Sequence, residues 1–129
     1  MLEAGITTFI LANGPLTAII SDRLYPDALP QSPTLPALVY QVLPAALNYS
    51  HDGDSHLDRV RVQFSCWATS PTSAANLREV LRLALSGFSG QMGTAKVPAV
   101  FIEDQGGGQD EATGLFRKIV DGIFWHQSI

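Results

Sequence analysis

The clearest pattern in this 129-residue chain is the alternation of apolar and polar residues from Asp58 to Ala68. The apolar positions are Val60, Val62, Phe64 and Cys66, and the intervening positions are Arg59, Arg61, Gln63, Ser65 and Trp67. Because successive side chains of a strand point to opposite faces, the alternation predicts a strand with one buried and one polar face. Cys66 is expected to be a small buried hydrophobic residue of that strand.

Apolar residues at helical spacing predict helices at two places in the chain. The first helix covers about residues 2–12 and is capped by Asn13-Gly14, and a short helical turn follows Pro15 over residues 16–20. Ser70-Pro71 begins a longer amphipathic helix, because a hydroxyl cap followed by proline favours a helix start. Gly87 is expected to end it.

The remaining segments predict three more strands and three connections. The strands cover residues 37–43, 97–103 and 115–126. Residues 25–36 hold four prolines and predict an irregular extended connector, whereas residues 45–56 predict a long polar loop. The run of Gly106, Gly107 and Gly108 predicts a flexible hairpin tip within residues 104–114.

The predicted order of elements is helix, strand, strand, helix, strand, strand. Two antiparallel hairpins joined by a helix form one four-stranded, mainly antiparallel sheet with the helices on one face. The fold class is therefore α+β, a two-layer sandwich. The length fits one domain over residues 1–129, with no room for two ordinary cores.

Composition narrows the class of protein. Charged residues make up 16% of the chain, against about 25% in a typical soluble domain, and hydrophobic residues make up 46%. This balance argues against intrinsic disorder and leaves surface for contact with other protein. The net charge of −4 with only eight Lys and Arg argues against phosphate-driven nucleic-acid binding. The uncharged run from Ala4 to Ser21 is broken by Asn13-Gly14-Pro15, which favours a short helix and a turn over a membrane span.

No arrangement of residues predicts catalysis, a cofactor site or a metal site. The run His51, Asp52, Asp54, His56 and Asp58 contains possible metal ligands, but its spacing matches neither a zinc motif nor a calcium loop. A solvated polar loop is the preferred interpretation, and a small ligand- or metal-binding module remains the alternative. The glycine run lacks the Lys and Ser or Thr of a phosphate-binding loop. We therefore expect no enzyme and no cofactor.

The polar face of the strand over residues 58–68 is the main candidate for binding. Trp67 and its arginine neighbours are residue types favoured at protein interfaces, although Trp67 at a core edge is an equally good interpretation. The interface residues that we predict are Tyr25, Leu35, Tyr49, His51, Arg59, Arg61 and Trp67. Asp52 and Asp54 are predicted to be acids of a projecting arm or of a channel wall.

Several short segments, in this order, carry a resemblance to a known family. They are the N-terminal helix that starts Met1-Leu2-Glu3-Ala4, Arg23-Leu24-Tyr25-Pro26, Leu35-Pro36-Ala37-Leu38-Val39-Tyr40-Gln41, the strand from Leu57 to Ala68, a helix rich in Leu and Ala, Phe101-Ile102-Glu103-Asp104 and Ile123-Phe124-Trp125-His126. The chain resembles, over essentially its whole length, the tail-completion or tail-terminator proteins of long-tailed, non-contractile bacteriophages and phage-like particles. These are also described as head–tail joining proteins.

The resemblance implies a structural protein of the virion neck, assembled in the host cytoplasm. Such proteins form a ring, usually a hexamer, that caps the tail tube, stops its polymerisation and meets the head-side connector or stopper protein, while DNA passes through the lumen without specific binding. A connector-side neck adaptor or stopper is the alternative role. The long uncharged stretch over residues 28–51 is the predicted place for contacts between subunits, and residues 4–21 are expected to be mostly buried within the subunit.

Overall fold

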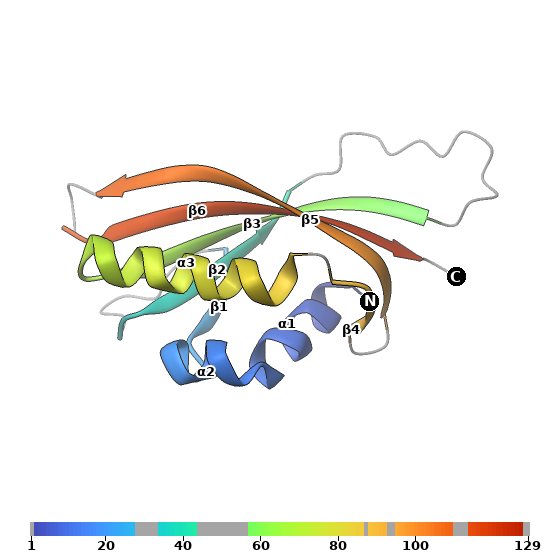
Figure 1. Ribbon diagram of the computed structural model, residues 1–129, viewed down its shortest axis with the longest axis horizontal. Coiled ribbons are helices and arrows are strands. Elements are labelled where there is room, and N and C mark those ends of the chain that lie inside the picture. Colours follow the sequence, from blue (N-terminus) through green and yellow to red (C-terminus); the bar gives the residue numbers. More distant parts are fainter. Residues whose placement is uncertain are drawn as a thin grey trace.

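A six-stranded sheet carries three helices on one of its faces (Figure 1). The computed structural model describes residues 2–27, 34–43, 57–86, 88–92, 95–109 and 114–127. The strands are β1 (Leu24–Pro26), β2 (Ala37–Val42), β3 (Leu57–Ala68), β4 (Gly90–Met92), β5 (Ala95–Gln109) and β6 (Phe116–Gln127). Their order across the sheet is β1-β2-β3-β6-β5-β4, and only the β1–β2 pair is parallel among them.

The predicted α+β class is confirmed, but the predicted strand number of four is wrong. The four predicted strands form the centre of the sheet as β2, β3, β5 and β6. The edges are β1 and β4, of three residues each, which are too short to show a period in the sequence. Tyr25 and Pro26 therefore belong to the sheet and not to an irregular connector, because β1 pairs with residues 38–40 of β2.

Strand β3 lies at the centre of the sheet and has the predicted two faces. It pairs with β6 over twelve residues, from Leu57 opposite Gln127 to Ala68 opposite Phe116, and with β2 on its other side. Val62, Phe64 and Cys66 are completely buried, as the alternation predicts. On β6, Val120 and Phe124 lie opposite Phe64 and Val60 and continue the same apolar layer.

The helices are α1 (Leu2–Ala12), α2 (Gly14–Ile20) and α3 (Pro71–Leu85). Ser70 caps α3 as predicted, with its side-chain oxygen accepting a hydrogen bond from the backbone N–H of Ser73 at 3.1 Å. Asn13 was expected to end the first helix, but it caps the start of α2, where its Oδ1 accepts from the N–H of Leu16 at 3.1 Å. Gly14 lies inside α2. Gly87 lies outside the described residues.

The core lies between the helices and the sheet. Ile6 and Ile10 of α1, Leu16 and Ile20 of α2, and Leu77, Leu81 and Leu85 of α3 pack in one cluster with the apolar face of the sheet. The rings of Phe64 and Phe124 lie at its centre, 6.2 Å apart. The expectation that residues 4–21 are mostly buried holds for one stripe only, because Leu11, Ala12, Pro15 and Ala18 are exposed.

The glycine run lies within β5, which corrects the prediction of a flexible hairpin tip. Gly106, Gly107 and Gly108 pair with Ile119, Lys118 and Arg117 of β6, and the strand continues to Gln109. A bulge lies between Asp104 and Gly106, and Gly106 has a φ of +83°. At Gly107 a Cβ atom would overlap the carbonyl oxygen of Arg117 and lie 2.8 Å from the Cα of Lys118. Glycine is therefore required there by close approach of two strands.

This close approach predicts different effects for neighbouring glycines. Gly107→Ala forces β5 and β6 apart and is expected to lower the free energy of unfolding by about 1–3 kcal/mol. Gly108→Ala is the matched control, because a Cβ there meets nothing within 4 Å, and its change is expected to stay within about 0.5 kcal/mol. Denaturant unfolding of the two variants tests this, and equal stability would contradict the packing described here.

Burial predicts the reactivity of the single cysteine. The apolar surroundings of Cys66 raise the pKa of its thiol to about 12, so the thiolate is scarce at pH 8. A thiol reagent at pH 8 is expected to leave the native chain unlabelled over the time in which it labels the denatured chain completely. Mass spectrometry measures the labelling over time. Prompt labelling of the native protein would contradict the burial of Cys66.

Candidate interaction surface

Within the described residues, no helix packs on the face of the sheet that points away from α1, α2 and α3 (Figure 1). Strand alternation and register place the following side chains on it: Tyr25, Val39, Gln41, Arg61, Gln63, Ser65, Trp67, Phe101, Glu103, Arg117, Ile119, Asp121, Ile123 and Trp125. We call this surface the open face. It mixes aromatic and branched apolar side chains with a few charges, and Phe101 is 57% exposed.

The charges at the middle of the open face form a three-residue network. Arg61 Nη1 donates to Asp121 Oδ2 at 2.6 Å and to Glu103 Oε1 at 3.2 Å, and so joins β3 to β6 and β5. The hydrogen bond to Asp121 is the main cause that raises the pKa of Arg61 above its usual value. Asp121 is 6% exposed, and its Oδ1 is buried without a hydrogen-bond partner. Within the described residues, the network therefore carries one unsatisfied buried acceptor on the side of the sheet away from the helices.

At one end of the open face an arginine lies over a tryptophan. Arg117 and Trp67 are opposite each other on β6 and β3, and the Arg117 guanidinium carbon lies 5.2 Å from the Trp67 ring centre. Such a cation–π contact is worth about 0.5–1 kcal/mol at an exposed site. Arg117 is exposed and forms no ion pair with a carboxylate among the described residues. Within the described residues, the contact of its guanidinium group is the one with the Trp67 ring.

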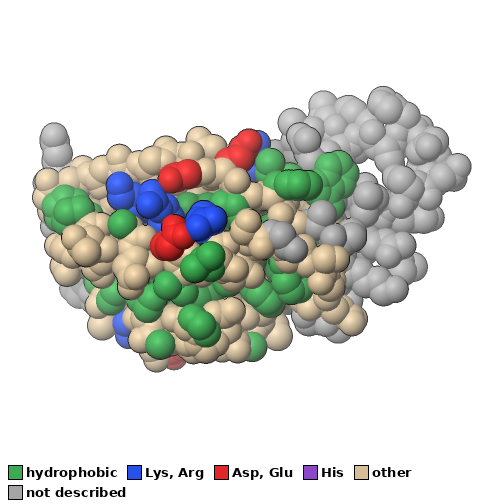
Figure 2. Space-filling model, viewed as in Figure 1, with side chains coloured by type: hydrophobic (Ala, Val, Ile, Leu, Met, Phe, Trp, Pro, Cys, Tyr) green, Lys and Arg blue, Asp and Glu red, His purple; other side chains and the backbone are tan. Residues whose placement is uncertain are grey.

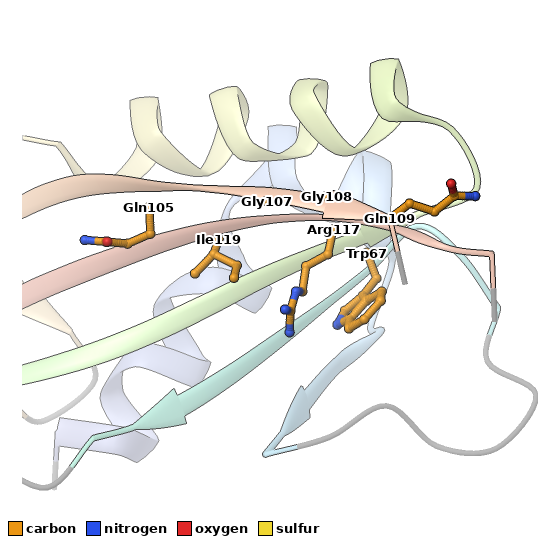
Figure 3. A pocket seen from close by; sticks show the side chains of 7 residues that line it. All are labelled: Trp67, Gln105, Gly107, Gly108, Gln109, Arg117 and Ile119. Atoms are coloured by element: carbon orange, nitrogen blue, oxygen red, sulfur yellow. The ribbon is translucent and has the colours of Figure 1, made fainter. Parts of the chain in front are cut away.

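A pocket of about 720 Å³ lies beside this pair. It is lined by Trp67, Gln105, Gly107, Gly108, Gln109, Arg117 and Ile119 (Figure 3). Figure 3 shows the side chains of Trp67, Arg117 and Ile119 on the side of the sheet away from α3. Gly106 and Gly108 would otherwise place side chains over Ile119 and Arg117, so their lack of side chains keeps the pocket open.

Most of the other described charges lie on the helix side of the molecule. Arg78 Nη1 pairs with Asp104 Oδ2 at 2.8 Å, and Arg82 pairs with Glu79 one turn away on α3. The hydrogen bond from Arg82 lowers the pKa of Glu79 and raises that of Arg82. Figure 2 shows acidic and basic side chains in a band over α3 and the strands above it, with mostly apolar and uncharged side chains below. The helical side thus presents largely satisfied charges.

The predicted interface residues are only partly gathered together. Arg61, Trp67 and Tyr25 share the open face, while Leu35 is half-buried just before β2. Arg59 pairs with Trp125 along the backbone, and its side chain lies outside the described set. Tyr49, His51, Asp52 and Asp54 also lie outside the described residues, together with most of the possible metal cluster. Elsewhere in the described residues no three His, Cys, Asp or Glu side chains are grouped to hold a metal ion.

Comparison with known proteins decides the class of this chain. The sequence model of the family described as tail completion protein gp17 matches residues 4–127. The chain belongs to the tail completion protein family. It is accordingly a structural protein of a virion tail. A search of curated proteins finds no match.

The fold of this tail completion protein also occurs in a solved particle. A chain of the structure titled "Virion of native gene transfer agent (GTA) particle" superposes with a TM-score of 0.73 at 14% sequence identity. The match covers 99% of this chain and 95% of that chain. At this identity the likeness establishes a shared fold. No helix within the described residues is long and apolar enough to cross a membrane.

Most of the open face was missed by reasoning from the sequence. Arg117, Ile119 and Asp121 on the last strand are recognisable only once that strand is aligned against β3, because the residues between them are not strictly polar or apolar. The local signal was weak, because the side chains that share this face of the strand, from Arg117 to Trp125, mix charged and apolar residues. Glu103 became a partner of Arg61 through a contact 42 residues apart in the chain.

The Arg61 network predicts a stability change in the tail completion protein. Arg61→Met leaves the buried Asp121 carboxylate without its charge partner and is expected to lower the free energy of unfolding by about 1–2 kcal/mol. The value is kept low because the Arg61 side chain is 38% exposed and solvent screens the pair. The control Arg82→Met breaks an exposed pair on α3 and is expected to leave stability unchanged within error. Denaturant unfolding with R61M as stable as the parent would contradict this role of the network.

Proposed function

We propose that this tail completion protein forms a ring, most simply a hexamer, at the end of the tail tube. The ring stops tube polymerisation and joins the tail to the head connector or stopper protein. The single observation that carries the proposal is the family match over residues 4–127. The shared fold with a chain of a phage-like particle supports it. The role is structural and requires no chemistry at the open face.

The surface described above suits a subunit of a ring. A closed ring is built from heterologous contacts, in which one patch of each subunit meets a different patch of the next. The open face offers aromatic and branched side chains, a pocket, and an arginine that has no ion pair among the described residues. In the described part of the chain, the helices cover only the opposite face of the sheet, so the open face is free to be buried by a neighbouring subunit.

The charge of the chain fits a channel through which DNA passes. Six copies with a formal charge of −4 each carry about −24 in total. An acidic ring repels phosphate, so DNA slides through the lumen without specific binding. Asp52 and Asp54 are proposed as acids of the channel wall or of arms that reach the tube protein.

The proposal predicts the length and the ends of tail tubes. Tubes polymerised from the tail tube protein without this chain are expected to grow to variable lengths, and the added chain is expected to stop growth and to appear as a ring at one end. Negative-stain images of tubes with and without the chain measure both effects. The control is an unfolded preparation of the same chain. Binding to the connector complex with no effect on tube growth would contradict the tube role and favour a neck adaptor or stopper.

A further inference from the structure

Two exposed acids remain unpaired at one edge of the sheet. The structure describes the side chains of six acids, and four of these, Glu79, Glu103, Asp104 and Asp121, form ion pairs. The other two, Asp22 and Asp27, are exposed and flank β1, the edge strand of three residues. No ion pair holds either carboxylate among the described residues. The β1 segment, Ser21–Asp27, is therefore an edge with two free negative charges.

Unpaired positive charge lies at a different place in the fold. Arg61, Arg78 and Arg82 pair with carboxylates, and Arg23 donates to the carbonyl oxygens of Pro36 and Ile19 at 2.8 and 3.0 Å. Two other described cations have no carboxylate partner among the described residues. One is Lys118, half-buried on the helix side of β6. The other is Arg117, at the start of β6, which lies over the Trp67 ring and lines the pocket. Among the described residues, the acids without an ion pair therefore flank the edge strand β1, whereas Arg117, also without one, lies on β6, with β2 and β3 between the two strands.

The described residues do not account for the pocket beside Arg117. Glycine is required at position 107 because β6 approaches too closely for a Cβ atom, and it is favoured at position 106 because φ is positive there. Neither constraint applies to Gly108. A side chain at Gly108 would lie next to Arg117 on the open face and would fill the pocket. Glycine at this position leaves open space beside Arg117.

We propose that this pocket of one subunit receives the β1 segment of the next copy of the same chain. Arg117 pairs with Asp22 or Asp27 of the neighbour through charge-assisted hydrogen bonds, and Trp67 contacts Tyr25 and Pro26. Complementary charges on two different patches of one chain give a head-to-tail contact, which closes into a ring if the rotation allows. The inference rests on the proposed ring and assigns its subunit contact.

A charge exchange tests the pairing directly. R117D and the double variant D22R/D27R are each expected to reduce self-association at least tenfold, measured as cross-linked multimers of the full chain, free and on tail tubes. The triple variant R117D/D22R/D27R is expected to restore association to within about threefold of the parent. D22N/D27N is a milder variant that suits the φ of +68° at Asp27 and is expected to weaken association in the same direction. R82E is the matched charge reversal on α3 and is expected to leave association unchanged.

The pocket is tested separately by filling it. Gly108→Leu is expected to abolish association while unfolding stays cooperative, and Gly14→Leu, at another glycine with free space, is the control. Unchanged association of R117D or of Gly108→Leu would overturn the inference, and so would losses that the triple variant does not restore. A parent chain that associates through this pair yet never joins a tube would contradict the proposed function and leave the subunit contact standing.

Discussion

The twelve-residue pairing of β3 with β6 is the constraint on which the rest of the structure depends. The two strands are fixed in one register, so every side chain of β3 is assigned to the helix side or to the open face. A slip by one residue would put Phe64 on the open face and Arg61 into the core, which the apolar cluster under the helices forbids. The same register places Trp67 opposite Arg117 and brings Asp121 within reach of Arg61. The core and the open face are thus two consequences of one pairing.

The elements with a strong local signal could be predicted from the sequence. The alternation around Phe64 specified β3, and Ser70 followed by proline specified the start of α3. The glycine run could not be interpreted locally, because glycine favours a turn in isolation and is also required where two strands approach closely. Only the position of the Arg117 carbonyl explains Gly107. The edge strands β1 and β4 could not be predicted for the same reason. Each has three residues, whose extended structure depends on pairing with the adjacent strand, β2 or β5.

For the candidate site, the sequence predicted the residues of β3 but not their partners on β5 and β6. One strand carries Arg61 and Trp67, and alternation alone placed both on the polar side. Their partners come from β5 and β6, and Asp121 is 60 residues away from Arg61 in the chain, so no local pattern joins them. The resulting open face has no helix packed on it within the described residues. It contains the buried Asp121 Oδ1, which has no hydrogen-bond donor among those residues, and a pocket beside Gly108. In a structural protein of a virion tail, these features are explained if the open face is completed by another subunit.

The most direct test of that claim is the accessibility of Trp67 in the free chain and in the assembled tail. Hydroxyl-radical footprinting with mass spectrometry measures the oxidation rate of this side chain in both states. The account predicts that Trp67, half-buried in the single subunit, is oxidised several times more slowly once the tail is complete. Equal oxidation rates in free and assembled protein would contradict it, because they would show that the open face stays uncovered.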